Sequence, residues 1–163
     1  RNNLMKITIL TVGKIKEKFY TEALNEYSKR LSRYCKLEII QVADEKTAEN
    51  CTENEADIVK QKEAERLLKH IPEDAYVITL EINGKNLDSV ELAEKINRLG
   101  ISGTSHIVFV IGGSLGLHKS VSDRADFKLS FSRMTFPHQL MRVILLEQIY
   151  RSYRIINNQP YHK

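Results

Sequence analysis

Two short segments of this sequence carry residue types that could bind a small ligand, and the first is rich in glycine. It reads Gly-Gly-Ser-Leu-Gly at residues 112–116 and follows an apolar run at residues 107–111. Glycine permits positive φ angles and a close approach of ligand to backbone, which suits an adenosine or a phosphate. The segment matches neither the dinucleotide-binding GxGxxG pattern nor the phosphate-binding loop that ends in Gly-Lys-Ser/Thr. A plain tight turn therefore explains it equally well.

The second segment, at residues 130–139, reads Ser-Phe-Ser-Arg-Met-Thr-Phe-Pro-His-Gln. We expect a strand to end here, a loop of hydroxyl and apolar side chains to follow, and a helix to begin. The free backbone amides at that helix start could hold a carboxylate or the polar edge of a base. The alternative is purely structural, with Thr135 or Phe136 as a cap and Pro137 as a first-turn residue.

The predicted C-terminal helix and the tail after it gather charged and aromatic side chains. The helix carries Arg142, Glu147, Arg151 and Arg154. A solvated basic face, or a pairing of Glu147 with an arginine, would explain these four residues. The tail ends in Tyr-His-Lys and so places a ring, an imidazole and an ammonium in succession. Such a set can stack on a base and contact phosphate, although a frayed terminus is the simpler interpretation.

Alternating apolar patterns predict that an α/β fold positions these segments. Strands are expected at residues 5–12, 37–42, 76–82, 107–111 and 127–131, and helices at residues 16–34, 52–70, 89–99, 119–124 and 137–156. Thr52 and Glu55 predict a capping box, Gly100 a helix end, and Asn83 with Gly84 a turn. Strands that alternate with helices favour a mainly parallel sheet, with ligands beyond the carboxyl ends of its strands. Here those ends are residues 80–81, 111–113 and 131–132.

The final helix is apolar on more than one side. Leu140, Val143 and Ile144 form one stripe, and Met141 and Leu145 widen it. A helix of this kind is covered on several sides. We expect a second subunit to supply part of that cover; the alternative is a central core helix within one subunit.

Composition favours one globular domain and excludes several classes of protein. The chain has 163 residues, of which 42% are hydrophobic and 28% charged, and its apolar runs are far too short for a membrane span. No signal peptide is expected, and Met5 reads as a natural start, so that residues 1–4 are expected to be an extension. Cys35 and Cys51 are expected to be free thiols in a reducing cytosol, and the histidines lack metal-site spacing.

The charge is unevenly distributed along the chain. The net charge is +4, but residues 1–43 and residues 128–163 each carry +5, whereas residues 44–74 carry −5. Two basic ends predict a positive face that would attract a polyanion such as RNA.

Several segments together resemble one known family, the bacterial ribosomal RNA large-subunit methyltransferase H family, which is one of the SPOUT methyltransferases. The segments that carry the resemblance are residues 5–14, 79–85, 109–116, 129–142, 147–151 and 161–163. The resemblance covers the chain from Met5 to Lys163. It implies a cytoplasmic homodimer with an α/β/α sandwich, a mainly parallel sheet of five or six strands, and a C-terminal trefoil knot.

The resemblance also implies an activity. Family members use S-adenosyl-L-methionine to methylate N3 of a pseudouridine in a stem-loop of 23S rRNA, on the assembled ribosome. They need neither a metal nor a membrane. By match of position, the cofactor pocket would comprise eight residues. These are Leu80, Gly112, Phe131, Ser132, Arg133, Met134, Thr135 and Phe136.

We further expect the tail to act on the target base. Tyr161 and His162 would reach the base by crossing to the cofactor pocket of a partner subunit, while Arg142 and Arg154 would contact phosphate or stabilise developing negative charge. The residue that accepts the N3 proton stays open. The alternatives are a SPOUT enzyme for another RNA such as tRNA, a non-catalytic RNA-binding or ribosome-assembly protein, and an unrelated nucleotide-dependent enzyme.

Overall fold

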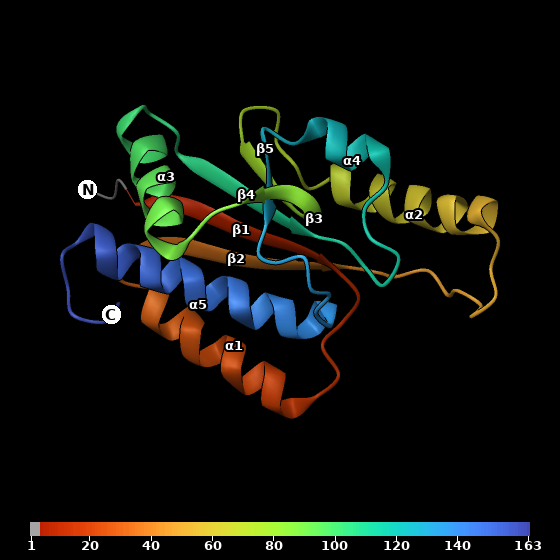
Figure 1. Cartoon of the computed structure of the whole chain (residues 1–163), viewed down its shortest axis with the longest axis horizontal. Helices are drawn as coiled ribbons and strands as arrows, with labels where there is room; N and C mark the ends of the chain where they lie inside the picture. The colour runs from red at the N-terminus through yellow and green to blue at the C-terminus, as the bar shows by residue number, and fades with distance from the viewer. Residues whose placement is uncertain (1–3) are drawn as a thin grey trace.

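Five parallel strands form one sheet in the computed structural model, which describes residues 4–163 (Figure 1). The strands are β1 (Met5–Val12), β2 (Cys35–Val42), β3 (Tyr76–Asn86), β4 (His106–Ile111) and β5 (Phe127–Ser130), in the order β2-β1-β4-β3-β5. The helices are α1 (Lys18–Leu31), α2 (Glu53–Leu68), α3 (Ser89–Ile101), α4 (Lys119–Arg124) and α5 (His138–Ile156). The predicted α/β fold with a parallel sheet is thus confirmed. The expectation for residues 1–4 lies, apart from Leu4, outside the described residues.

Both faces of the sheet are covered, which explains the apolar central strands. Along β4, Ile107, Phe109 and Ile111 pack against the face that carries α1, α3 and α5, whereas Val108 and Val110 pack beneath α2 and α4. Figure 1 shows α5 lying along the sheet with α1 beside it, and α5 also contacts α3. A parallel strand buried on both sides needs an unbroken apolar run, and β4 has one.

Two predicted helix boundaries have different outcomes. The capping box of Thr52 and Glu55 is confirmed: the Glu55 amide donates to the Thr52 hydroxyl, and the Thr52 amide donates to the Glu55 carboxylate. The predicted helix end at Gly100 is wrong, because α3 continues to Ile101 and the positive φ of +101° falls at Gly103 instead.

Among residues 4–163, no helix is long and apolar enough to cross a membrane.

The predicted turn at Asn83 and Gly84 is also wrong. The strand β3 continues to Asn86, but its register against β5 shifts, so that Leu80 and Lys85 both align with Leu129. Residues 81–84 therefore leave the ladder and return to it in the same direction. A Cβ atom at Gly84 would lie only 2.7 Å from the Lys128 carbonyl oxygen, so this crossing requires glycine. The trefoil knot implied by the resemblance stays a prediction.

Candidate ligand cavity and C-terminal cluster

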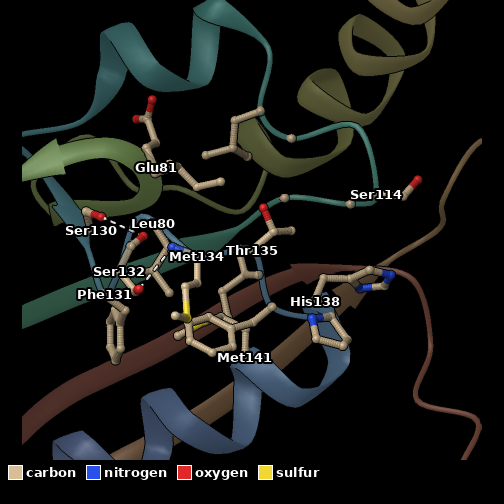
Figure 2. Close-up of a pocket in the computed structure, with 18 of the residues that line it drawn as sticks. Leu80, Glu81, Ser114, Ser130, Phe131, Ser132, Met134, Thr135, His138 and Met141 are labelled. Atoms are coloured by element: carbon tan, nitrogen blue, oxygen red, sulfur yellow. Dashed lines mark hydrogen bonds between the residues drawn. The ribbon is translucent and has the colours of Figure 1, made fainter.

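A cavity of about 740 Å³ lies where β3, β4 and β5 end and α5 begins (Figure 2). It is the edge of the sheet at which the sequence predicts a ligand. The walls combine residues 80–82, 111–117, 129–132 and 134–138 with Met141. Seven of the eight expected cofactor residues therefore line one cavity. The eighth, Arg133, is exposed and does not line it.

The glycine-rich loop forms one wall of the cavity, and its glycines serve the loop itself. The Gly116 amide donates to the Gly113 carbonyl at 3.1 Å, and Gly116 has a φ of +88°. A Cβ atom at Gly112 would lie 2.8 Å from the Gly116 carbonyl carbon. The loop closes tightly on its own backbone, and this closure holds the residues between the glycines beside the cavity.

The hydroxyl-rich loop after β5 forms the opposite wall. The Met134 amide donates to the Ser132 hydroxyl at 3.0 Å, and the Ser130 hydroxyl donates to the Ser132 carbonyl at 3.2 Å. The Asn86 side chain donates to the Ser130 carbonyl at 3.1 Å. The serines thus shape the loop, which leaves the side chains of Phe131 and Met134 and the start of α5 to face a ligand (Figure 2).

The start of α5 offers unused hydrogen-bonding groups. The N-cap residue Pro137 makes no side-chain cap hydrogen bond, so the first amides of the helix lack a capping side chain. The buried Nδ1 of His138 has no partner within the described chain. Burial, with a smaller contribution from the nearby Arg142 guanidinium, lowers the pKa of His138, which therefore favours its neutral form.

Two ionisable residues of the cavity wall, Glu81 and His138, are not among the eight expected cofactor residues. Glu81 directly follows Leu80 at the end of the regular part of β3, and its carboxylate accepts hydrogen bonds from Thr79 and Ser122. His138 belongs to the same conspicuous segment as Phe136. Position next to an expected residue, at the carboxyl end of a strand or the start of a helix, was the signal available for both.

Arg142, expected to contact phosphate, is 1% exposed in this chain. One guanidinium nitrogen donates to the Val12 carbonyl at 2.7 Å, and Nε and the other terminal nitrogen have no partner within the described residues. Burial lowers the pKa of Arg142 to about 10, which leaves it charged at neutral pH. The side chain lies one helical turn beyond His138 and is shielded from solvent.

The C-terminal tail is held against α5, so a frayed terminus is ruled out for this structure. The Tyr161 hydroxyl donates to the Glu147 carboxylate at 2.8 Å, and the Tyr161 ring packs edge-on against Tyr150 with 5.0 Å between ring centroids. The Arg151 guanidinium lies over the Tyr161 ring at 4.6 Å and also pairs with Glu147 at 2.9 Å. The packing fixes Tyr161 and leaves His162 exposed.

Arg154 fastens the chain just before these residues. Its guanidinium donates to the Pro160 carbonyl at 2.8 Å and to the Tyr34 hydroxyl at 3.2 Å. The Tyr34 hydroxyl in turn donates to the Gln159 side chain. We call Glu147, Arg151, Arg154, Tyr161 and His162 the tail cluster.

The cavity and the tail cluster lie toward opposite ends of α5 in one chain. The cavity includes Met141, whereas Tyr161 bonds to Glu147, six residues later, and His162 lies beside Arg151, ten residues later. These separations are about 9 Å and about 15 Å along a helix. Figure 1 shows the C-terminus beside the far end of α5 from the helix start. Within one chain, therefore, Tyr161 and His162 do not reach the cavity.

Two large apolar side chains near the cavity end of α5 are exposed. Phe19 at the start of α1 is 62% exposed, and Met134 is 73% exposed. The Gln139 side chain links the start of α5 to the segment before α1 through hydrogen bonds with the Lys14 carbonyl and the Lys16 amide.

Elsewhere, Cys35 and Cys51 are free thiols, and residues 4–163 contain no cluster of three or more His, Cys, Asp or Glu side chains able to hold a metal.

Comparisons with known proteins match nearly the whole length of the chain. Residues 5–162 match the family model described as "Predicted SPOUT methyltransferase". The chain is 62% identical over 159 residues to "Ribosomal RNA large subunit methyltransferase H" of Bifidobacterium adolescentis and 61% identical to the protein of that name from Clostridium novyi. Each alignment covers 98% of this chain and 100% of the relative. A solved structure, "a probable methylase family protein from Haemophilus influenzae Rd KW20", shares the fold with a TM-score of 0.55 and 14% identity, covering 96% of this chain and 70% of that one.

Proposed function

Because the chain belongs to the SPOUT methyltransferase family, we propose that it methylates N3 of a pseudouridine in a stem-loop of 23S rRNA on the assembled ribosome. S-adenosyl-L-methionine is the proposed donor. The observation that carries the proposal is the cavity itself, which gathers the strand-terminal loops of β3, β4 and β5. The rRNA substrate follows the names of the full-length relatives, and the two basic ends of the chain support a polyanionic partner.

The residues present fit a donor of this size and chemistry. The cavity volume of about 740 Å³ lies in the range of small-molecule sites. Leu80, Leu115 and Met134 supply apolar walls for an adenine ring, and the loop backbones supply hydrogen-bonding groups for its polar edge. When bound, the donor supplies a methyl group already made electrophilic by its sulfonium.

The protein's own tasks are then alignment and control of charge. The cavity walls would hold the methyl carbon in line with N3 and exclude water. In the balanced reaction, a new bond joins N3 to the methyl carbon, the electron pair of the broken carbon–sulfur bond stays on sulfur, and the N3 proton passes to solvent. The buried, charged Arg142 would favour the deprotonated base through its field rather than by contact.

A homodimer would complete the site. In one chain, about 9 Å of helix separates Met141 in the cavity from Glu147 in the tail cluster, and about 15 Å separates it from Arg151 beside His162. The exposed Phe19 and Met134 offer an apolar surface at the cavity end of α5. With a second copy packed there, the partner's tail would meet this chain's cavity. His162, which is exposed, would face the base, and Tyr161 and Arg154 would position it.

Methyl-transfer assays on whole ribosomes, free 23S rRNA and tRNA test this function. We expect transfer to ribosomes, with mass spectrometry locating the methyl group on a pseudouridine. Transfer to tRNA instead would favour another RNA target. Calorimetry without any heat from the donor would favour a non-catalytic RNA-binding protein.

Removal of residues 160–163 should abolish methyl transfer while preserving donor binding. Full activity of that truncated chain would exclude the tail from the site.

A further inference from the structure

One carboxylate gives the cavity wall its charge. Of the described residues that line the cavity, Glu81 alone carries a full charge, because His138 favours its neutral form and the remaining residues are apolar or uncharged polar. No lysine, arginine or histidine of residues 4–163 forms an ion pair with Glu81 within 4 Å. The wall therefore carries one negative charge that has no ion-pair partner within the described chain, while the buried Arg142 guanidinium places a positive charge close to the wall residue His138.

Hydrogen bonds fix the position of this carboxylate. The Thr79 hydroxyl donates to Oε2 at 2.6 Å, and the Ser122 hydroxyl lies 3.0 Å from both carboxylate oxygens. Figure 2 shows Glu81 at the edge of the cavity, with its carboxylate turned toward α4. Thr79 and Ser122 are both neutral, so they orient the carboxylate without cancelling its charge. Glu81 therefore acts on a ligand mainly through its electric field.

Methyl transfer changes the charge of the ligand in the cavity. A sulfonium donor carries one positive charge more than the thioether by-product that it becomes, while the two molecules are otherwise nearly the same in shape. A fixed negative charge at the wall distinguishes two such ligands by Coulomb energy alone. The neighbouring apolar walls and loop backbones, by contrast, contact the parts that both ligands share.

We propose that Glu81 is a specificity-determining residue, which makes the cavity prefer a sulfonium donor over its neutral thioether by-product. This inference rests on the proposed function and adds a role to the same site. Loss of the positive charge on transfer weakens the hold of the cavity on the spent ligand. Glu81 thereby favours release of the by-product and limits its inhibition of the next turnover.

Calorimetric titration with S-adenosyl-L-methionine and with S-adenosylhomocysteine tests this role. Glu81→Gln keeps the shape of the side chain and removes its charge. We expect donor affinity to fall by about five- to tenfold and by-product affinity by less than about twofold, given a through-space interaction between partly solvated charges. Glu94→Gln is the matched control, because it removes one carboxylate charge from an exposed position on α3 that does not line the cavity, so the ratio of the two affinities should stay unchanged.

Equal losses for both ligands in Glu81→Gln would overturn the proposal, since the carboxylate would then contact a part that both ligands share. Unchanged affinities for both ligands would overturn the proposal as well. If the wild-type chain binds neither ligand, the proposed function fails and not merely the role of Glu81. Should Glu81→Gln not fold, the wild type still gives a test: added salt should weaken binding of the donor more than binding of the by-product.

Discussion

The cavity and the tail cluster, which α5 joins, differ in how their polar groups are satisfied. In the cavity, short hydrogen bonds such as that from Met134 to Ser132 shape the loops, while the start of α5 lacks a cap and His138 Nδ1 lacks a partner. In the tail cluster, the Glu147 carboxylate accepts from Tyr161 and pairs with Arg151, and among the described residues of the cluster only Arg154 Nε is buried without a partner. The contrast teaches that the cavity is built to receive a ligand, whereas the tail cluster is built to hold its own shape and present His162.

The sharpest test of this contrast asks whether the two regions act together across a dimer. Thr135→Trp fills the cavity from an exposed position, and removal of residues 160–163 eliminates the tail. Each variant alone should be inactive. An equal mixture of exchanging dimers should recover about a quarter of wild-type methyl transfer, because half the dimers are mixed and one of their two sites is intact.

Subunit exchange in that mixture is followed by native mass spectrometry. A mixture that forms mixed dimers and yet stays inactive would contradict a site shared between subunits. Methyl transfer by the truncated chain alone would also contradict a shared site, since the cavity would then be sufficient for the reaction without the tail.

The cavity should be more sensitive than the tail cluster to a change in backbone packing. Gly84→Ala places a Cβ atom 2.7 Å from the Lys128 carbonyl oxygen, where neither backbone segment can give way. We expect the free energy of unfolding to fall by about 3 kcal/mol and donor affinity to be lost with the geometry of the wall. Chemical denaturation measures the first effect and calorimetry the second.

The matched control for that change is Gly100→Ala. The new Cβ atom would lie 3.7 Å from the Met5 methyl carbon, an ordinary contact, within the helix α3. Gly100 is the second-last residue of α3, so alanine there should raise the free energy of unfolding by at most about 0.5–1 kcal/mol, the value for a helix interior. If both variants behaved alike, the close crossing of β3 and β5 would not be the cause.

The tail cluster should respond to loss of one hydroxyl with a smaller and separable effect. Tyr161→Phe removes the hydrogen bond to Glu147 and keeps the ring between Tyr150 and Arg151. We expect the free energy of unfolding to fall by about 1 kcal/mol and methyl transfer to fall several-fold, with donor affinity unchanged. Reduced donor affinity would mean that the tail cluster and the cavity are not independent in binding.

The smallest effect concerns pH. Burial lowers the pKa of His138 below its usual 6.5, so near that pH the unfolded chain binds a proton that the folded chain does not. The stabilisation from neutral His138 is complete above about pH 6.5 and is lost as the pH falls toward the lower folded pKa. Urea unfolding between about pH 7.5 and about pH 5 should show a smaller loss of stability for His138→Asn than for the wild type. If the free energy of unfolding fell equally with pH in the variant and the wild type, His138 would not contribute to the pH dependence of stability.

Local patterns were sufficient to predict the elements and the edge of the sheet that holds the cavity. The apolar run of β4 needed burial on both faces, and the Thr52–Glu55 spacing specified its own cap. Because every strand is parallel, the carboxyl ends of β3, β4 and β5 lie at the same edge of the sheet, and they lie side by side because these three strands are neighbours in it. This explains why Leu80, Gly112 and Phe131 were placed together correctly.

Features that depend on distant partners were beyond the sequence. The double alignment of Leu129 with Leu80 and Lys85 has no local signature, since Asn83 and Gly84 look like an ordinary turn. The burial of Arg142 depends on the Val12 carbonyl, 130 residues away, and the order of the tail depends on Tyr34 and Gln159, 125 residues apart. Spacing along the chain does not encode such pairings.

The double alignment of Leu129 also sets the order in which this molecule can mature. As a nascent chain emerges from its N-terminus, β3 and β4 arrive first, but residues 81–84 have nothing to wrap around until β5 arrives. Because β5 is the last strand of the sheet to be synthesised, we expect closure of the cleft to be a late event in folding. A small molecule that binds only the closed cleft would then stabilise the fully folded chain relative to a folding intermediate in which the cleft is open.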